Sequence, residues 1–530
     1  NGSYTSTLTA TTPGTATVTA AVTPTLDPDG APVTPDPVTL TITPGAPNPT
    51  TSTLTTVRTT QTTDDAATLS LQLVDAHGNP TTLDAVPLQP TTLDLTTTHG
   101  TLTPPRRRAD GTYVSTLAAT RPGTATVTAT LDGRALPTVP TISVRAAPGG
   151  VRWSRSFGVA LDSVRDLAAD GDGHIYVTGS TAAALAGANA GKKDAYLRKY
   201  TLDGTLVWTR QFGSSKDDGA NAVAIDAQGR PYVAGFSNGP IPGAEGASGT
   251  DAFVRAYAAD GTVRWTTQFA DVRISDVAVD ADGYAYVGGR VEPKRFTYDA
   301  HVRAYDPDGT IRWKKTFGDA DNSTSANGVA TDAEGYVYVS GNTETTLVEG
   351  ETLVGNDDAF VRSYVSNGDV RWTEQFGTPA FDEATDVATG EDGHVYVTGR
   401  TRGSLLSPSD VHAGGLDVFV RSFVSNGDVR WTDQFGTSAD DEGTDVTVGA
   451  DGLVALTGKT EGDLERTLVG TEDGFLRTYD TEGARRGALQ YGGSADQYAF
   501  GVALDAKGNA YVAWSGEQAP TVNGIRRFRP

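Results

Sequence analysis

The stretch FVRSYVSNGDVRWTEQFGT, residues 360–378, returns as FVRSFVSNGDVRWTDQFGT at residues 419–437. The copies differ only at Tyr364/Phe423 and Glu374/Asp433, and their tryptophans, Trp372 and Trp431, lie 59 positions apart. Self-similarity at a period of tens of residues is the mark of a repeat fold, in which each copy is one structural unit. The duplication therefore predicts a series of like units.

Further copies fill residues 151–530. Each contains a strand such as DVAVD (276–280), a turn DADG (280–283) and a strand YAYVGG (284–289), followed by strands like DAFVRAY (251–257) and GTVRW (261–265). Tryptophan recurs at positions 153, 208, 265, 313, 372 and 431, and the seventh copy, GALQYGG, is expected to carry Leu489 in the tryptophan position. Each unit is thus predicted to have four strands.

Both faces of these strands are predicted to be buried. Val263, Trp265 and Phe269 share one face, and in the strand at 251–257 Ala252 and Val254 lie opposite Phe253 and Tyr257. Sheets packed between other sheets need such two-sided burial, as the blades of a propeller do. The first strand occurs seven times, ending at Asp170, Asp226, Asp280, Asp332, Gly390, Gly449 and Asp505, which predicts seven blades.

The two ends of this region complement each other. It opens with a lone fourth strand, VRWSRSFG (151–158), and closes with a lone third strand, GIRRFRP (524–530). Pairing of 151–157 with 524–530 would complete the last blade and leave no open sheet edge. The recurring DxxG-x-x-YVxG and FVRxY patterns resemble the bacterial β-propeller repeat (SBBP) family, and this resemblance covers 151–530.

The first 148 residues differ in composition and contain their own repeat. NGSYTSTLTATTPGTATVTAAV (1–22) matches DGTYVSTLAATRPGTATVTATL (110–131). In the second copy Ala125, Val127, Ala129 and Leu131 alternate with threonines, which is the period of a strand with one buried face. Together with LQLVDAHGNPTT (71–82) and THGTLTP (98–104), the region resembles the bacterial Ig-like domains of invasin and intimin.

That resemblance implies a complete Ig-like domain at 47–148 and the C-terminal half of another at 1–46, with the missing half expected before Asn1. Such arrays serve as stalks or spacers in the family. The short segment 147–150 is predicted to join two separately folded regions. The expected fold class is all-β: Ig-like sandwiches followed by a seven-bladed β-propeller closed by its terminal strands.

Composition narrows the function classes. The net charge of −23 argues against nucleic acid, whose phosphates require clustered Lys and Arg. The absence of Cys excludes disulfides, thiolate nucleophiles and cysteine metal sites. No run of about 18 apolar residues exists in the sequence, so no membrane span is expected.

Aspartates form two candidate sets. DGDG (170–173) and DADG (280–283) place Asp170, Asp172, Asp280 and Asp282 at calcium-loop spacing, but the full D-x-D-x-D-G…E pattern is missing, so turn chemistry is favoured and Ca²⁺ is the only cofactor considered. A second set follows the FG of the fourth strands, and a structural hydrogen-bonding role is favoured for it because it recurs. It comprises the aspartates Asp217, Asp218, Asp382, Asp440, Asp441 and Asp496, with Glu383 beside Asp382.

The second set is expected on the face where long, variable loops such as 290–298 and 400–416 emerge, because ligand sites concentrate on variable loops held by a rigid scaffold. A partner is therefore predicted to bind there, and charge reversal at Asp218, Asp382 or Asp441 is predicted to weaken it.

No catalytic residues are predicted. GFSNG (235–239) fits a nucleophile elbow, but it aligns with strand ends in the other copies, and no His partner accompanies it. His174 and His394 are expected to be surface strand residues. The expected function is that of a non-catalytic, extracellular bacterial surface protein in adhesion or in a surface layer or appendage, with envelope proteins or surface glycans as partners. The alternative is a propeller enzyme or glycan-binding module acting on extracellular polysaccharide.

Overall fold

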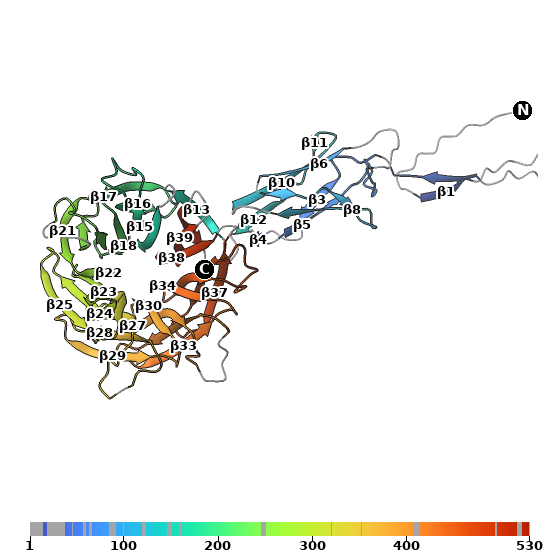
Figure 1. Cartoon of the computed structure of the whole chain (residues 1–530). Helices are drawn as coiled ribbons and strands as arrows, with labels where there is room; N and C mark the ends of the chain where they lie inside the picture. Colours follow the sequence, from blue (N-terminus) through green and yellow to red (C-terminus); the bar gives the residue numbers. More distant parts are fainter. Residues whose placement is uncertain are drawn as a thin grey trace, which may run out of the picture. The chain divides into compact units, whose positions relative to one another are not determined.

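The computed structural model describes residues 14–18, 38–44, 46–56, 60–62, 66–83, 92–98, 100–118, 123–145, 151–157, 162–244, 251–319, 321–350, 352–406, 413–492, 496–516 and 522–528. These residues contain strands and turns but no helix, and hence none that is long and apolar enough to span a membrane. The chain divides into two compact units, Asn1–Gly150 and Val151–Pro530 (Figure 1). The predicted linker at 147–150 lies outside the described residues.

The first unit contains a separate strand pair and two larger sheets. The pair is β1 (Gly14–Val18) with β2 (Val38–Ile42), and these are the only described strands of the predicted half-domain at 1–46. One sheet has the order β3 (Thr53–Thr56), β5 (Ala66–Gln72), β9 (Tyr113–Ala118), β7 (Thr101–Leu102), with β8 (Arg106–Arg107) also on β9. The other has the order β11 (Arg134–Ala135), β10 (Gly123–Leu131), β12 (Thr141–Arg145), β4 (Thr60–Thr62), with β6 (Leu93–Thr97) also on β10.

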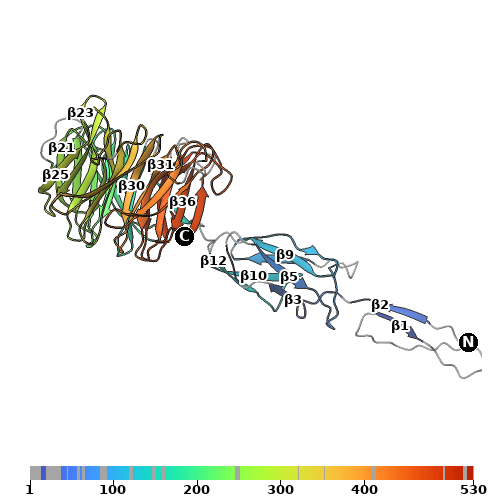
Figure 2. The ribbon, with the colours of Figure 1, turned by 90° about the horizontal axis from the view of Figure 1, so that it is seen from below.

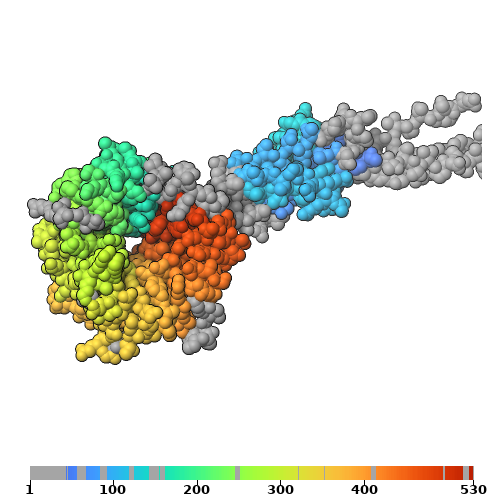
Figure 3. Space-filling model, viewed as in Figure 1, coloured from blue at the N-terminus to red at the C-terminus, as the bar shows by residue number. Residues whose placement is uncertain are grey.

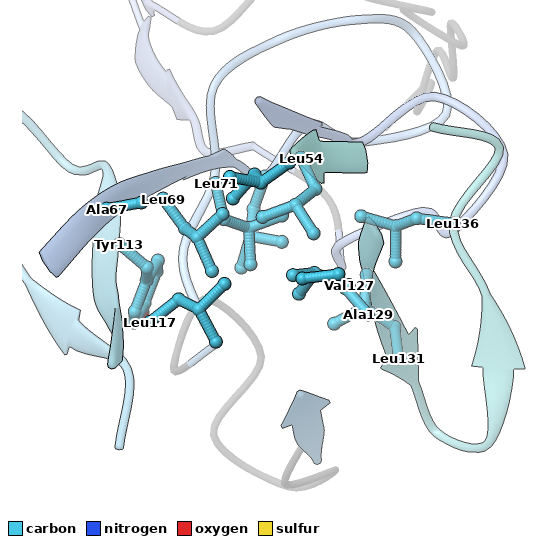
Figure 4. Packing of buried hydrophobic residues seen from close by; sticks show 13 residues of the cluster. Leu54, Ala67, Leu69, Leu71, Tyr113, Leu117, Val127, Ala129, Leu131 and Leu136 are labelled. Carbon is cyan, nitrogen blue, oxygen red and sulfur yellow. The ribbon is translucent and has the colours of Figure 1, made fainter. Parts of the chain in front are cut away.

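The core of this unit lies between its two sheets. Leu69, Leu71 and Leu117 come from one sheet and meet Val127 and Leu131 of the other (Figure 4). The predicted alternation is confirmed, because the four apolar residues of 125–131 are at most 1% exposed while the intervening threonines reach the surface. The threonines favour the extended backbone and cover the outer face.

The described residues of the second unit form seven four-stranded antiparallel sheets, numbered here 1 to 7 along the chain. Sheet 1 is β14 (Ser163–Ala169), β15 (His174–Thr181), β16 (Asp194–Thr201) and β17 (Leu206–Phe212). Sheet 2 is β18 (Asp218–Ile225), β19 (Pro231–Ser237), β20 (Asp251–Tyr257) and β21 (Val263–Ala270). Sheet 3 is β22 (Val272–Val279), β23 (Ala285–Lys294), β24 (Thr297–Tyr305) and β25 (Ile311–Phe317).

Sheet 4 is β26 (Thr324–Thr331), β27 (Val337–Thr343), β28 (Asp358–Tyr364) and β29 (Val370–Phe376). Sheet 5 is β30 (Asp382–Thr389), β31 (Val395–Thr401), β32 (Asp417–Phe423) and β33 (Val429–Phe435). Sheet 6 is β34 (Asp441–Val448), β35 (Val454–Thr460), β36 (Asp473–Tyr479) and β37 (Arg485–Tyr491). Sheet 7 is β38 (Gln497–Leu504), β39 (Ala510–Gly516), β40 (Val522–Phe528) and β13 (Val151–Phe157).

The sheets follow one another around a common centre (Figure 1), and Figure 2 shows the same unit from its side. The first strand of each sheet is its inner strand, and each inner strand contacts the inner strand of the next sheet. The series returns to its start, because β38 also contacts β14. The predicted pairing of the terminal segments is present as well: β13 pairs antiparallel with β40, with Arg155 opposite Ile525.

Neighbouring sheets interlock through repeated side chains. The indole Nε1 of Trp265 donates to the carbonyl oxygen of Pro307 (3.0 Å), and Trp372 does the same to Ser425 (2.8 Å). Gly309 lies beside Trp265 with a φ of +89°, and a Cβ atom there would come within 2.7 Å of the indole. Arg255 of the FVRxY pattern stacks on Phe212 of the preceding sheet, 4.2 Å from its ring centroid. The residues of the repeated sequence motifs therefore form contacts between neighbouring sheets.

The long loops are tied down by a repeated Gln–Asp pair. Gln375 Nε2 donates to Asp358 Oδ2 (2.9 Å), and its Oε1 accepts the backbone N–H of Leu347 (2.8 Å). Equivalent pairs are Gln211 with Asp194, Gln268 with Asp251, Gln434 with Asp417, and Gln490 with Asp473. Leu347, in one of these loops, packs against a hydrophobic cluster.

Register corrects three expectations from the sequence. Gly487, rather than Leu489, lies opposite Thr478 and so holds the tryptophan position of sheet 6. Val263 is 46% exposed, because a register shift at Arg264 separates it from the buried face that Trp265 occupies. The segment 290–298 is mostly strand rather than loop, since β23 and β24 extend to a tight turn whose tip, Phe296, has a φ of +72°.

We expect the β13–β40 pairing to be essential for the stability of the second unit. Removal of residues 524–530 deletes Ile525 and Phe528, both 0% exposed, and leaves one side of β13 without its partner. Loss of two such residues costs several kcal/mol, so the melting temperature should fall by several degrees in calorimetry. Val263→Ala, which truncates an exposed side chain, is the control and should change it little. An unchanged melting temperature in the truncated chain would contradict this role.

Candidate functional site

Each of the seven inner strands carries one unpaired residue at the same place, where its register against the second strand shifts. One extra residue of this kind is a β-bulge, which bends the strand and turns the side chain in a new direction. The bulge residues are Arg165, Asn221, Ser275, Asn327, Thr385, Thr444 and Phe500.

In four sheets the bulge side chain ties its sheet to the next one. These bonds run from Asn221 Nδ2 to Ile274 O (2.7 Å), Asn327 Nδ2 to Ala384 O (2.9 Å), Thr385 Oγ1 to Gly443 O (2.8 Å) and Thr444 Oγ1 to Ala499 O (3.0 Å). The other three, Arg165, Ser275 and Phe500, make no such bond to a described residue of the next sheet. Arg165 and Ser275 are exposed instead, and Phe500 is partly exposed.

The residue after the bulge is an aspartate in four sheets. Its carboxylate accepts a backbone N–H of the next inner strand: Asp166 from Val223 (2.7 Å), Asp276 from Val329 (2.7 Å), Asp386 from Val446 (2.9 Å) and Asp445 from Val502. In sheet 4 the residue after the bulge is Gly328, and Asp386 of the next inner strand lies close to it. A Cβ atom at Gly328 would come within 2.7 Å of Asp386 Oδ1. These aspartates therefore join inner strands to one another.

Their environment disfavours the charged form. Burial raises the pKa of Asp166 to about 7, and the nearby carboxylate of Asp386 adds to the shift. Burial, together with the charges of Asp386 and Asp166, also raises the pKa of Asp276. Asp386 and Asp445 share a hydrogen bond, and burial raises the pKa of both. Two adjacent carboxyls cannot both ionise cheaply, so this pair retains a proton.

Two adjoining hollows, of about 920 and about 700 Å³, lie over sheets 7, 1, 2 and 3. They share Arg165, Asn221, Phe236 and Phe500 in their linings. The lining residues come from the beginnings of inner strands and the ends of second strands, where the 2–3 and 4–1 connections emerge. This is the face on which the sequence predicts partner binding, and an opening is visible near the centre of the second unit in Figure 3.

Charged side chains are distributed unevenly around the opening on this face, which is called the mouth below. Glu383 lies opposite Arg400 in sheet 5 and pairs with it at 2.6 Å, while Glu442 lies opposite Lys459 in sheet 6 and pairs with it at 3.4 Å. In sheet 3 the same two positions are Arg273 and Arg290. Like charges directly opposite across strands are destabilising. Neither arginine forms an ion pair with a described residue.

Aromatic rings accompany the arginines of the hollows. Arg165 lies 5.6 Å from the ring centroid of Phe500, and Arg290 lies 4.4 Å from that of Tyr298. Phe236, at the end of β19, is partly exposed to both hollows. The arrangement offers guanidinium groups and flat apolar surfaces, a combination that is typical of ligand-binding sites.

The predicted acidic set divides into two groups. Asp218, Asp382 and Asp441 are 0% exposed, and each accepts a backbone N–H from the segment before its strand, donated by Ser214, Thr378 and Thr437. Burial raises the pKa of all three. Charge reversal at these positions would therefore act on the fold rather than on a surface contact, contrary to the expectation from the sequence.

The other three aspartates of the set are partly exposed, and each contacts a residue in a neighbouring loop. Asp440 accepts the N–H of Leu416 (2.8 Å), Asp496 accepts that of Thr471 (3.0 Å), and Asp217 lies 3.8 Å from Lys192. Of the whole set, only Asp217 and Asp218 line the hollows.

The calcium candidates lie at turns. Asp170 accepts the N–H of His174 (2.8 Å) and the hydroxyl of Tyr176 (3.1 Å), and Asp280 accepts the N–H of Tyr284 (2.9 Å) and the hydroxyl of Tyr286 (3.1 Å). Asp172 and Asp282 are exposed. Within the described ranges, no group of three or more His, Cys, Asp or Glu residues could hold a metal ion. The oxygens of Asp170 and Asp280 thus take part in turn hydrogen bonds.

The residues of GFSNG and the two histidines do not form a catalytic group. Ser237 is buried at the end of β19, where its hydroxyl bonds Asp218 and Gly239. His174 and His394 each pair with an aspartate of their own turn, Asp170 (3.0 Å) and Asp392 (2.6 Å), and are partly exposed.

Sequence reasoning missed Arg165, Arg273, Arg290 and Phe500. Aligning the inner strands would have shown that Arg165 and Phe500 stand where other copies have Asn or Thr. The pairing of Arg273 with Arg290 needs the register between β22 and β23, which a sequence repeat alone does not state.

Comparison with known proteins confirms both resemblances. Residues 48–147 match the family model "Invasin, domain 3", and residues 312–346 match the "Beta-propeller repeat" model (SBBP). The regulatory protein FlaEY of Caulobacter vibrioides is 27% identical over 391 residues, which cover 62% of this chain and 40% of that protein. The chain therefore matches less than half of the length of this relative.

Solved structures that resemble the chain include the β-propeller domain of the Trilobed protease from Pyrococcus furiosus, at 9% identity and a TM-score of 0.40 over 69% of this chain and 95% of that one. An ulvan lyase of polysaccharide lyase family PL25 aligns at 12% identity and a TM-score of 0.42 over 71% and 96%. The Yersinia pseudotuberculosis adhesin InvE aligns at 20% identity and a TM-score of 0.19 over 56% and 68%. The invasin-type domain together with a propeller fold suggests a bacterial surface protein.

We expect Asp166 to make the stability of the second unit depend on pH. A carboxyl whose pKa is higher in the folded chain than in the unfolded chain stabilises the fold fully below about pH 4, and this contribution is lost as the pH rises through about 7. The wild-type melting temperature should therefore fall more between pH 5 and 8, in calorimetry, than that of Asp166→Asn. Asp172→Asn, at an exposed turn, should keep the wild-type slope. Equal slopes in all three proteins would contradict titration of Asp166 in this range.

Proposed function

We propose that this protein is a non-catalytic, extracellular component of the bacterial surface, acting in adhesion or in a surface layer or appendage. In this proposal the seven sheets are the blades of a closed seven-bladed β-propeller that binds the partner, and the Ig-like region serves as a stalk or spacer. Envelope proteins or surface glycans are the partners.

Two sets of contacts support the closed propeller. The inner strands contact one another in a continuous series from β14 to β38 and back to β14. The β13–β40 pairing places the first and last strands of the region in one sheet. Closure of this kind removes the open edges through which sheets aggregate.

The observation that carries the proposed function is the composition of the two hollows. Their lining presents the side chains of Arg165, Arg273, Phe236 and Phe500. The carboxylates of the lining already have partners: Asp162 accepts the N–H of Ala182, Asp218 accepts that of Ser214, and Asp217 lies 3.8 Å from Lys192. Binding sites for small or extended ligands combine flat apolar groups with a few polar ones in this way.

One observation favours the alternative, a propeller enzyme acting on polysaccharide. Asp386 and Asp445 form an acid pair at the inner strands with raised pKa values, and perturbed carboxyls cluster at active sites. Each, however, accepts an N–H of the next inner strand, from Val446 and Val502, so the pair already has a structural task.

The test separates adhesion from catalysis. Beads coated with the full chain should adhere to bacterial envelope fragments, whereas beads coated with albumin should not. The soluble chain, incubated with purified envelope and extracellular polysaccharides, should leave their chain lengths unchanged in size-exclusion chromatography. Depolymerisation that disappears in Asp386→Asn would overturn the non-catalytic proposal in favour of the enzyme. Beads that fail to adhere to any envelope fraction would overturn adhesion.

A further inference from the structure

We propose that the two hollows over sheets 7, 1, 2 and 3 bind a segment of an acidic polysaccharide. Arg165, Arg273 and Arg290 would meet the carboxylate or sulfate groups of the sugars, and Phe236 and Phe500 would lie against sugar rings. This inference rests on the proposed binding function of the second unit and names its ligand.

The first argument is the local surplus of positive charge. The chain carries a net charge of −23, yet three arginines and no carboxylate line the hollow of about 700 Å³. The adjoining hollow of about 920 Å³ is mixed in charge, because Asp162, Asp217 and Asp218 line it together with Arg165 and Lys193. Sheets 5 and 6 show what the fold does elsewhere at this level, because Arg400 there pairs with both Glu383 (2.6 Å) and Glu442 (2.7 Å). In sheet 3, where the hollows lie, two arginines therefore replace this pairing of Glu with Arg or Lys.

The second argument is the direct opposition of Arg273 and Arg290 across β22 and β23. Two guanidinium groups at paired positions repel each other, and an anion between them would relieve that repulsion. Arginine suits carboxylate and sulfate groups because its planar fork donates two parallel hydrogen bonds. Ser275, the exposed bulge residue of β22, adds a hydroxyl beside them.

The third argument concerns the sugar rings of the ligand. Phe500 takes the bulge position that Asn or Thr holds in four other sheets, so an apolar ring replaces a bond between sheets. Phe236 also lines both hollows. Apolar faces of sugar rings and aromatic side chains are complementary flat surfaces. A hollow that combines such rings with three cations fits a sugar chain that carries negative groups.

Size and net charge favour a polysaccharide over other polyanions. Each hollow has about the volume of a complete small-ligand site, so the two adjoining hollows accommodate several linked residues. A nucleic acid needs many phosphate contacts, and a chain of net charge −23 with three available arginines does not supply them. Poly-glutamate shares the carboxylates but lacks rings to lie on Phe236 and Phe500.

The experiment measures affinity of the full chain by isothermal titration calorimetry at low ionic strength. The probes are polygalacturonate for carboxylated sugars, chondroitin sulfate for sulfated ones and dextran for neutral ones. We expect at least one acidic polysaccharide to bind, with an affinity that falls as salt rises, and dextran to bind about tenfold more weakly or not at all. Comparison of the two acidic probes then shows which anionic group is preferred.

The Arg273→Ser/Arg290→Ser double variant should lose about tenfold or more in affinity, with an unchanged or higher melting temperature because the repulsion is removed. Arg295→Ser, which changes an exposed arginine of the β23–β24 hairpin outside both hollows, is the matched control and should bind as the wild type does. If the double variant fails to fold, the single variant Arg165→Ser at an exposed position replaces it.

Four outcomes would overturn this assignment: no acidic polysaccharide binds, dextran binds equally well, poly-glutamate or a single-stranded oligodeoxynucleotide binds more tightly than the polysaccharides, or a folded arginine variant binds unchanged. Adhesion of coated beads together with any of these outcomes would leave the surface function standing and remove only the acidic-sugar ligand.

Discussion

The hydrogen bonds between β13 and β40 connect the two ends of the second unit, from Val151 opposite Phe528 to Phe157 opposite Asn523. A sheet that is packed between two others has apolar residues on both faces, so a series of such sheets cannot end without exposing one of them. The β13–β40 pairing lets β38 contact β14, and thereby each sheet has a neighbour on both sides. The positions of the hollows depend on this, because their lining comes from sheet 7 as well as from sheets 1, 2 and 3.

Most of the repeated motifs serve contacts within or between sheets. The tryptophans donate to a backbone carbonyl of the next sheet, as Trp372 does to Ser425, and the arginines of FVRxY stack on a phenylalanine of the previous one, as Arg255 does on Phe212. The repeated Gln–Asp pairs hold the long loops in the same way. Buried carboxylates also serve as acceptors for the chain's own backbone, as Asp218 does for Ser214, Asp382 for Thr378 and Asp441 for Thr437. These bonds stabilise buried N–H groups that would otherwise lack partners.

Candidate function arises where the repeat departs from itself. At the bulge, Asn and Thr hold neighbouring sheets together, and the copies that replace them with Arg165 and Phe500 release those side chains into the hollows. At the mouth, an ion pair such as Glu383–Arg400 becomes the pair Arg273 and Arg290. Each of these substitutions removes a stabilising contact from the scaffold. Positions where a protein departs from its own structural pattern in this way are often functional.

The sequence by itself determined the repeat and the strands, because strand patterns and turns are local and recur with the period of the motif. It also predicted the pairing of 151–157 with 524–530, because the repeat region opens with a lone fourth strand and closes with a lone third strand. It also determined the buried face of residues 125–131. Only the tertiary structure decided which aspartates are buried, since Asp218 and Asp217 are adjacent in sequence but differ in burial. It alone placed Arg273 opposite Arg290, because register depends on bulges that shift pairing by one residue and on contacts between different strands.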